Sequence, residues 1–455
     1  MNLHKLLKAR AEADNPVRVG LIGAGKFGAM FLAQARRTDG MQILGIADLN
    51  LGRARETLQV TGWDAERYAA TSFADAMRSG ATYLTEDAEA LIKADGLEVL
   101  IDATGDPKAG IRHCLMAIEH RRHVIMVNVE ADVVAGPLLA RRAEQAGVVY
   151  SLAWGDQPAL ICEHVDWARA SGFEVASAGK GTRYHPTFHQ STPDDVWGNF
   201  GITPEVAERG RMNPKMFNSF IDGTKSGIEM TAVCNATGLT PQPGGLNFPP
   251  ASCYDLAEIC KPASAGGTLS HMGTTEVVSS INRDMTSVEH HLQMGTYVVV
   301  RAGHDYVRHC IEEYKMLPDS SYDFMALYRP THMIGLELGI SVASAALRGE
   351  PTGAATGFRA DVVATAKRAL KAGEILDGEG GYCVWGKQMP ADASMKLGGL
   401  PLGLASNVKL KADIAEGQQL TWTDVEIDET DAAIVFRREM EAAFGRPNED
   451  AAAAE

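Results

Sequence analysis

Short apolar runs alternate with segments of helical spacing along the first third of the chain. The runs at residues 17–23, 41–48, 123–132 and 148–159, and the start of residues 97–110, are typical of buried parallel strands. Between them, segments such as FGAMFLAQARR and GIRHCLMAIEHRR carry apolar residues every three or four positions, as amphipathic helices do. The pattern predicts an α/β fold with an N-terminal Rossmann domain over residues 1–155.

A glycine-rich turn follows the first predicted strand. Gly23, Gly25 and Gly28 fit the pattern G-x-G-x-x-G. The first glycine permits a tight turn, the second lets a pyrophosphate approach the backbone, and the third lets the new helix pack close to the sheet. The helix FGAMFLAQARR, which starts at Phe27, then points its free N–H groups at the phosphates, and Lys26 and Phe27 are expected among the cofactor-binding residues. We therefore expect a bound dinucleotide at this turn.

The second predicted strand ends at Asp48, which lies 20 residues past Gly28. An acid at this position can bond a ribose hydroxyl, which favours NAD. Arg53 and Arg55 follow and can meet a 2′-phosphate, which favours NADP, or can belong to a solvated helix face. The residues alone leave the choice of cofactor open.

Polar and small residues lie at the ends of the next two predicted strands. They are Thr104, Gly105, Asp106 and Asn128. Ligands bind beyond the carboxyl ends of parallel strands, so we expect these residues to line the nicotinamide pocket. The competing interpretation is ordinary turn chemistry.

The pattern changes after about Trp154, where residues 173–201 begin as a strand and become a polar loop. This stretch gathers basic side chains, namely Lys180, Arg183, His185 and His189. Local cations on an acidic chain indicate an anion site, such as one for a phosphate, although solvated surface charges are the alternative. Pro186 breaks any helix between the two histidines, which disfavours a zinc site.

Residues 218–239 predict a helix that is capped by Asp222 or Thr224. Lys225 and Glu229 lie four apart on a face that also carries apolar residues, so this face is expected to point inward. A lysine beside carboxylates suits proton transfer to a substrate oxygen. Lys225, Asp222 and Glu229 are therefore the catalytic candidates, and an exposed Lys–Glu pair is the alternative.

The C-terminal quarter contains two similar stretches, at residues 366–386 and 407–428. Each has a basic strand-like run followed by a glycine turn and a leucine. We predict a small, mostly β module with a fraying tail over residues 356–455, after a central α+β catalytic and dimerisation domain at 156–355. His332, which is placed at the start of a helix in the central domain, is interpreted as a packing residue.

The composition of the chain disfavours several classes of binding partner. The chain has 455 residues and a formal net charge of −15, which disfavours nucleic acid as a partner. Its seven cysteines form no C-x-x-C pair, which disfavours a disulfide scaffold or structural zinc and indicates reduced thiols in the cytoplasm. No secretory signal or membrane-length apolar stretch is present, so no membrane partner is expected.

Several motifs together resemble one group of enzymes. They are GLIGAGKFG, IDATGDP, VNVEAD, FIDGTKSGIEMTAVCNATGL, YRPTHMIGLELG and KAGEIL. The arrangement resembles the homoserine dehydrogenase-like oxidoreductases that end in an SAF-type β module. Within that group it is most similar to the reductoisomerase-like enzymes that act on 1-deoxy-D-xylulose 5-phosphate. True homoserine dehydrogenases carry a lysine directly after the strand-end asparagine, where this chain has Val129, and this difference disfavours homoserine as the substrate.

The resemblance implies an NADPH-dependent homodimer that converts 1-deoxy-D-xylulose 5-phosphate to 2-C-methyl-D-erythritol 4-phosphate, a step of isoprenoid precursor synthesis. It implies that residues 23–28 hold NADP and that the middle segments line the substrate site. The expected substrate-binding residues are Lys180, Arg183, His185 and Asn128. Lys225, poised by Asp222 or Glu229, would move protons. A divalent ion is compatible with this chemistry, but the sequence shows no dedicated carboxylate cage.

Two other functions are compatible with the same scaffold. One is a dehydrogenase of homoserine, an amino-acid semialdehyde, a sugar acid or a polyol. The other is a regulatory protein that senses a dinucleotide without performing chemistry. An inward-facing Lys225 and the basic loop argue against the sensor.

Overall fold

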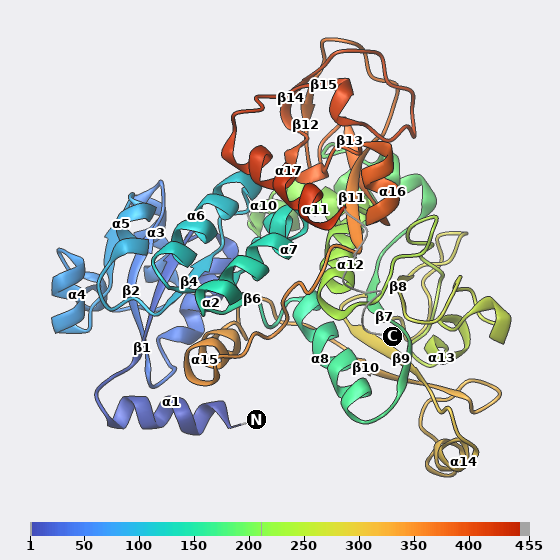
Figure 1. The fold of residues 1–455 in the computed structure, drawn as a ribbon, viewed down its shortest axis with the longest axis horizontal. Helices are drawn as coiled ribbons and strands as arrows, with labels where there is room; N and C mark the ends of the chain where they lie inside the picture. Colours follow the sequence, from blue (N-terminus) through green and yellow to red (C-terminus); the bar gives the residue numbers. More distant parts are fainter. Residues whose placement is uncertain (1, 211, 446–455) are drawn as a thin grey trace. The chain divides into compact units, whose positions relative to one another are not determined.

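The computed structural model describes residues 2–210 and 212–445, and the tail that the sequence predicts to fray lies outside the described residues beyond position 445. The chain divides into two compact units (Figure 1). The first unit comprises residues 1–160 and 333–356, and the second comprises residues 161–332 and 357–455. The α/β class, with small antiparallel sheets near the C-terminus, is confirmed. The three predicted domain boundaries stay a prediction.

A parallel sheet of six strands forms the centre of the first unit, in the order β3-β2-β1-β4-β5-β6. The strands are β1 (Val17–Ile22), β2 (Met41–Ala47), β3 (Tyr83–Thr85), β4 (Val99–Asp102), β5 (His123–Met126) and β6 (Tyr150–Leu152). The strand order reverses between β1 and β4, which is where such sheets bind dinucleotides. The predicted Rossmann architecture is confirmed.

Helices pack on this sheet (Figure 1). They are α1 (Leu3–Glu12), α2 (Lys26–Ala35), α3 (Leu51–Val60), α4 (Phe73–Ser79), α5 (Ala88–Lys93), α6 (Pro107–Glu119), α7 (Val129–Ala146) and α15 (Gly339–Arg348). Helix α15 comes from the returning segment, and its Val342 and Ala343 are buried in the same apolar core as Val19 and Ile101 of the sheet. The first unit is therefore completed by residues distant in sequence.

Helix α7 begins earlier than its sequence pattern indicates. The apolar alternation of residues 123–132 predicts one long strand, but β5 ends at Met126 and α7 starts at Val129. The side chain of Asn128 caps the helix by accepting a hydrogen bond from the N–H of Ala131 at 3.1 Å. Pro137 lies inside the helix.

The second unit contains a mixed four-stranded sheet in the order β10-β9-β7-β8. Its strands are β7 (Glu174–Thr182), β8 (Thr274–Ser279), β9 (Thr296–Arg301) and β10 (Phe324–Arg329). The helices of this part are α8 (Gln157–Ala170), which begins in the first unit, α9 (Val196–Phe200), α10 (Pro204–Arg209), α11 (Pro214–Ile221), α12 (Thr224–Thr237), α13 (Leu256–Ile259) and α14 (Asp305–Tyr314).

Two small antiparallel sheets follow in the same unit. One pairs β11 (Ala360–Ala366) with β13 (Val384–Pro390), and the other joins β12 (Ile375–Asp377), β14 (Ser406–Leu410) and β15 (Val425–Glu426). Helices α16 (Ala391–Leu397) and α17 (Ala432–Phe444) complete this part. Helix α12 packs against β11 and β13 as well as against β8, so it lies between the mixed sheet and the C-terminal strands (Figure 1).

Candidate active site

The glycine turn of the first unit is shaped to receive a phosphate group. Gly23 has a φ of +95°, and a Cβ there would lie 2.6 Å from the carbonyl oxygen of Ala103. A Cβ at Gly28 would lie 2.4 Å from the carbonyl oxygen of Gly23. At Gly25, by contrast, a Cβ would meet no atom within 4 Å, and no side chain caps the helix that follows. The turn therefore leaves the N–H groups of α2 accessible, which fits the pyrophosphate of a dinucleotide.

Asp48 and Arg53 bind each other beside this turn. The guanidinium of Arg53 donates to both carboxylate oxygens of Asp48, at 2.7 and 2.8 Å. Asp48 also accepts from the N–H groups of Ala24 and Asn50, each at 2.8 Å. Its carboxylate is thus fixed by the glycine turn, and its charge is offset by an arginine that remains half exposed. Lys26 and Arg55 are exposed, and Phe27 packs partly against the core.

The ends of β4 and β5 share one polar network. The amide of Asn128 donates to the carbonyl of Asp106 at 2.8 Å and to the hydroxyl of Thr104 at 3.2 Å. Thr104 in turn donates to Asp102 at 2.8 Å, and Asp102 accepts from the ring of His113 at 2.7 Å. The amide of Asn128 therefore has protein partners on both its nitrogen and its oxygen, which matches the turn-chemistry interpretation. Gly105 has a φ of +68° and open space around a built Cβ.

A buried ion pair occupies the centre of the second unit. The ammonium of Lys180 on β7 donates to the carboxylate of Glu229 on α12, and both side chains are nearly inaccessible to water. In the strand register, Lys180 lies opposite Thr296, which lies opposite Arg329. Residues opposite one another in a sheet point to the same face, so these three side chains form one row. The pairing of Lys180 with Glu229 joins two residues that the sequence analysis assigned to separate roles.

Two histidines adjoin this row. His164 of α8 bonds the hydroxyl of Thr296 at 3.0 Å, and burial, aided by the charge of Arg329, lowers its pKa to about 4. His332 follows β10 and bonds the carbonyl of Met294 at 2.8 Å. Burial lowers the pKa of His332, partly offset by that carbonyl and by Glu229. Both imidazoles are therefore neutral near pH 7. We call Lys180, Glu229, Thr296, Arg329, His164 and His332 the lysine–glutamate cluster.

Four members of this cluster, His164, Thr296, Arg329 and His332, are not among the site residues expected from the sequence. The expected place of His332 was the start of a helix, whereas α15 begins seven residues later, at Gly339. The row itself depends on strand register, which places Lys180 opposite Thr296 although the two are more than a hundred positions apart. No local motif signals the row, although a charged Lys180 within an apolar strand was one available sign.

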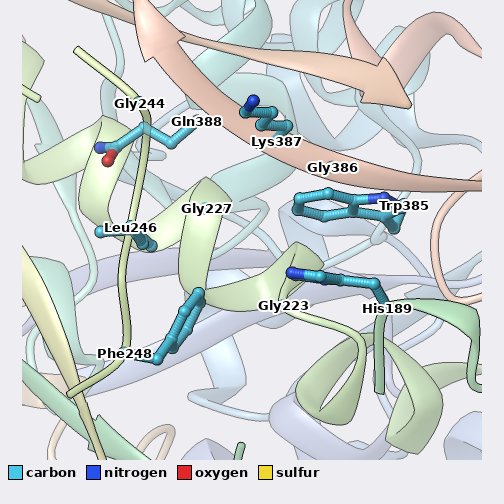
Figure 2. Close-up of a pocket in the computed structure, with 10 residues that line it drawn as sticks. All are labelled: His189, Gly223, Gly227, Gly244, Leu246, Phe248, Trp385, Gly386, Lys387 and Gln388. Carbon is cyan, nitrogen blue, oxygen red and sulfur yellow. The ribbon is translucent and has the colours of Figure 1, made fainter. Parts of the chain in front are cut away.

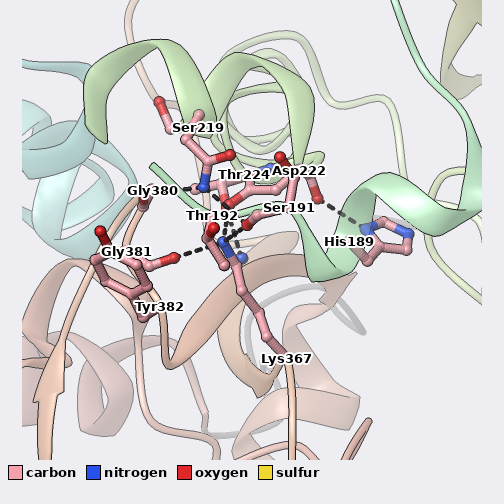
Figure 3. A network of polar contacts seen from close by, with 12 residues as sticks. His189, Ser191, Thr192, Ser219, Asp222, Thr224, Lys367, Gly380, Gly381 and Tyr382 are labelled. Carbon is pink, nitrogen blue, oxygen red and sulfur yellow. Dashed lines mark hydrogen bonds and ion pairs between the residues drawn. The ribbon is translucent and has the colours of Figure 1, made fainter. Parts of the chain in front are cut away.

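Lys225 lies half buried in the first turn of α12. Asp222, just before that helix, is completely buried and pairs with Lys367, which follows β11, at 2.8 Å. Lys367 also donates to the carbonyls of Ser191 and Gly381, each at 2.7 Å (Figure 3). Asp222 thus has a structural partner from the C-terminal strands, which the sequence analysis did not foresee.

Arg183 and His185 both form hydrogen bonds with other residues of the protein. Arg183 donates to the carbonyl of Asn199 at 2.7 Å. His185 uses both ring nitrogens, one with the hydroxyl of Thr187 at 2.8 Å and one with the carbonyl of Arg283 at 3.1 Å. Both ring nitrogens of His185 thus have protein partners, and its role in substrate binding stays a prediction. The imidazole of His185 therefore links its own turn, at Thr187, to the segment after β8, at Arg283.

No metal centre or membrane-spanning helix is found in the described part of the chain. Within residues 2–210 and 212–445, no group of three or more His, Cys, Asp or Glu side chains is arranged to hold a metal ion. None of the helices in those ranges combines the length and apolar character needed to cross a bilayer.

Residues 155–338 match a family model for the catalytic domain of an oxidoreductase. With a Rossmann-type first unit whose glycine turn fits a dinucleotide, this match defines the class: the protein is an NAD(P)-dependent oxidoreductase. The particular family that the matched stretch resembles is described as oxidoreductase DRL, and the stretch contains every member of the lysine–glutamate cluster. No curated protein matches the chain.

Several solved structures resemble the chain at low identity. A probable dehydrogenase from Thermotoga maritima is 12% identical over 73% of this chain and 90% of its own, with a TM-score of 0.39. The 1-deoxy-D-xylulose 5-phosphate reductoisomerase from Zymomonas mobilis, solved with NADPH, is 20% identical over 48% of this chain and 58% of its own, with a TM-score of 0.33.

An NAD-binding oxidoreductase from Klebsiella pneumoniae is 16% identical over 37% of this chain and 43% of its own, with a TM-score of 0.27. The chain therefore spans about half the length of the Klebsiella and Zymomonas proteins. These similarities are too low to define the substrate.

Proposed function

We propose that the protein is an NADPH-dependent reductoisomerase that converts 1-deoxy-D-xylulose 5-phosphate to 2-C-methyl-D-erythritol 4-phosphate. The observation that carries the proposal is the family match over residues 155–338, which contains the buried Lys180–Glu229 pair. The sequence motifs described above support the same substrate. We place the enzyme in the cytoplasm as a homodimer with an SAF-type C-terminal module, within isoprenoid precursor synthesis.

The reaction has two stages. One carbon–carbon bond of the ketose phosphate breaks and another forms, which gives a branched aldehyde of the same composition. The aldehyde carbon then gains a hydride, and its oxygen gains a proton. NADPH, when bound, supplies the hydride, so the chain itself must orient the substrate and handle protons on its oxygens.

The lysines of the second unit suit that proton chemistry. Lys180 is held by Glu229 in a site that excludes water, where a charge-assisted hydrogen bond to a developing alkoxide is strong. We assign proton transfer to Lys225 and to this pair, with Asp222 orienting the start of α12 through the N–H of Thr224 at 2.9 Å. Arg183 and Arg329 are the candidates for the phosphate.

The preference for NADPH follows from the Asp48–Arg53 pair. A free carboxylate at the end of β2 repels a 2′-phosphate, but here Arg53 offsets the charge of Asp48 and remains half exposed. We therefore propose that Arg53 meets the 2′-phosphate of NADP.

The function is tested by NADPH consumption with 1-deoxy-D-xylulose 5-phosphate, with the product identified by NMR, beside homoserine and unphosphorylated sugar acids. We expect turnover with the phosphorylated ketose and none with homoserine. Lys225→Met should lower kcat by about 100- to 10,000-fold at saturating NADPH, because proton transfer is lost. Lys411→Ala, which changes an exposed lysine, is the matched control.

Robust homoserine turnover would move the assignment to the dehydrogenase alternative. Tight NADPH binding without turnover of any carbonyl compound would contradict the proposed reaction. A kcat of Lys225→Met near that of the wild type would remove Lys225 from the catalytic assignment.

A further inference from the structure

A cavity of about 220 Å³ lies between α12 and β13 within the second unit (Figure 2). It is lined by His189, Gly223, Gly227, Gly244, Leu246, Phe248, Trp385, Gly386, Lys387 and Gln388. We call it the α12–β13 cavity. At about 30 Å³ for each water molecule of the liquid, it has room for roughly seven waters, which is the size of a small metabolite.

The cavity lies on the opposite side of α12 from the lysine–glutamate cluster. A Cβ at Gly227 would lie 2.8 Å from the carbonyl oxygen of Gly386 on β13, so this side of the helix faces the cavity wall. Glu229, which binds Lys180, is two residues further on, or about 200° around the helix axis. The cavity therefore lies on a different side of α12 from the Lys180–Glu229 pair.

Two polar groups of the cavity lack partners within the described residues. Gln388 is 2% exposed, and its amide oxygen accepts no hydrogen bond, while its nitrogen has only the sulfur of Cys234 at 3.8 Å. A buried acceptor without a donor costs about 1–3 kcal/mol, so a ligand that donates a hydrogen bond is favoured. Lys387, next to it on β13, forms no ion pair in the part of the chain that the structure describes.

The remaining walls are aromatic and held in place. The ring of His189 stacks on Trp385 with centroids 3.7 Å apart, and its two nitrogens bond the carbonyl of Asp222 at 2.7 Å and the hydroxyl of Tyr184 at 2.9 Å. Phe248 stacks on Tyr184 at 3.8 Å, and its N–H donates to the buried Glu276 at 3.2 Å. The walls are thus formed before any ligand binds, which reduces the cost of binding.

We propose that the α12–β13 cavity is a second binding site, for a small hydroxylated anion. Its anionic group would meet the ammonium of Lys387, a hydroxyl would donate to the amide oxygen of Gln388, and its carbon skeleton would lie against Trp385 and Phe248. A singly or doubly charged phosphate or carboxylate of a three- or four-carbon polyol has this combination of groups and this size.

The proposal is tested by calorimetric titration of the full chain with glycerol 3-phosphate as the probe. We expect saturable binding with a Kd of about 1 mM or tighter, and binding of uncharged glycerol at least about tenfold weaker. Lys387→Ala should raise the Kd of the probe by about 10- to 100-fold, because a charge-assisted contact is lost. Gly244→Val should block the site without strain, since a Cβ there meets no atom within 4 Å.

Two further variants separate this site from the proposed catalytic one. Lys180→Met and the surface control Lys411→Ala should both retain probe binding. The proposal is overturned if the wild type does not bind the probe, if glycerol binds equally well, or if Lys180→Met loses binding while Lys387→Ala and Gly244→Val keep it. Turnover of 1-deoxy-D-xylulose 5-phosphate is measured separately, so the two proposals can fail independently.

Discussion

Asp132 lies near the start of α7 and is 1% exposed. It accepts a hydrogen bond from the hydroxyl of Tyr150 at 2.7 Å, while its second oxygen has no partner in the described part of the chain. Burial raises its pKa to about 7, although the bond from Tyr150 opposes this. The folded chain therefore binds this proton more tightly than the unfolded chain, whose Asp pKa is near 4. Stability from this group is present below about pH 4 and is lost as the pH rises to about 7.

Asp132→Asn should remove this dependence. At pH 8 the variant should be more stable than the wild type, by at most about 4 kcal/mol, because no charge is buried. At pH 4 the two should be similar. Denaturant unfolding at both pH values measures the difference, and Asp39→Asn, at an exposed position, is the control. Equal stability of Asp132→Asn and the wild type at pH 8 would show that Asp132 is not buried as a charged group.

At the scale of elements, the glycine turn before α2 contains glycines with two different functions. Some are needed for the fold of the turn, and one is needed for binding. Gly23 and Gly28 are needed for the turn itself, because a Cβ at either would lie within 3 Å of a backbone oxygen. Gly25 has an ordinary φ of −73° and open space, so its lack of a side chain serves a ligand and not the fold.

Gly25→Val should consequently leave the thermal midpoint almost unchanged and weaken NADPH binding by about 100-fold or more, because the side chain occupies the path of the pyrophosphate. Fluorescence titration of NADPH and thermal unfolding measure the two effects. Gly198→Val on α9, where a Cβ also meets no atom within 4 Å, is the matched control. Unchanged NADPH affinity in Gly25→Val would exclude this turn as the cofactor site.

The secondary-structure elements also differ in how well they could be predicted from the sequence. In the first unit, β1, β2, β4, β5 and β6 and the helices α2 and α6 follow from apolar spacing, and the glycine turn follows from its motif, because both signals are local. The short elements β3, α4 and α5 were not predicted. The ends of elements were less predictable: residues 123–132 were expected to form one strand, but the chain turns into α7 after Asn128, whose side chain caps the helix. The partner of Lys180 depends on how α12 packs against β7, and the partner of Asp222 follows a strand more than a hundred residues away, so no local pattern contained them.

On the scale of the whole molecule, the buried Lys367–Asp222 ion pair connects segments that are distant in sequence. Lys367, which follows β11, pairs with Asp222 just before α12 and donates to the carbonyl of Ser191 in the loop after β7 (Figure 3). It also donates to the carbonyl of Gly381 within the C-terminal part. Neither side chain of the pair is more than 2% exposed, so removal of the lysine leaves a buried carboxylate without compensation.

Lys367→Met should therefore destabilise the second unit by about 3–5 kcal/mol in denaturant unfolding. Lys371→Ala breaks an exposed ion pair with Asp413, whose 2.7 Å separation is close to the 2.8 Å of the buried pair, and should cost about 1 kcal/mol or less. The double variant Asp222→Asn with Lys367→Met should recover part of the loss, since the unpaired charge is gone. A loss in Lys367→Met no larger than in Lys371→Ala would contradict the structural role of the pair.

The path of the chain has a consequence for synthesis on the ribosome. Helix α15, at residues 339–348, fills part of the core of a unit whose sheet was already complete at residue 152. During synthesis, nearly two hundred further residues must be added after that sheet is complete before α15, the last helix that covers it, is made. During this interval the surface later covered by Val342 and Ala343 is exposed to water. A nascent chain with such an exposed apolar surface is a natural client for chaperones that bind emerging polypeptides.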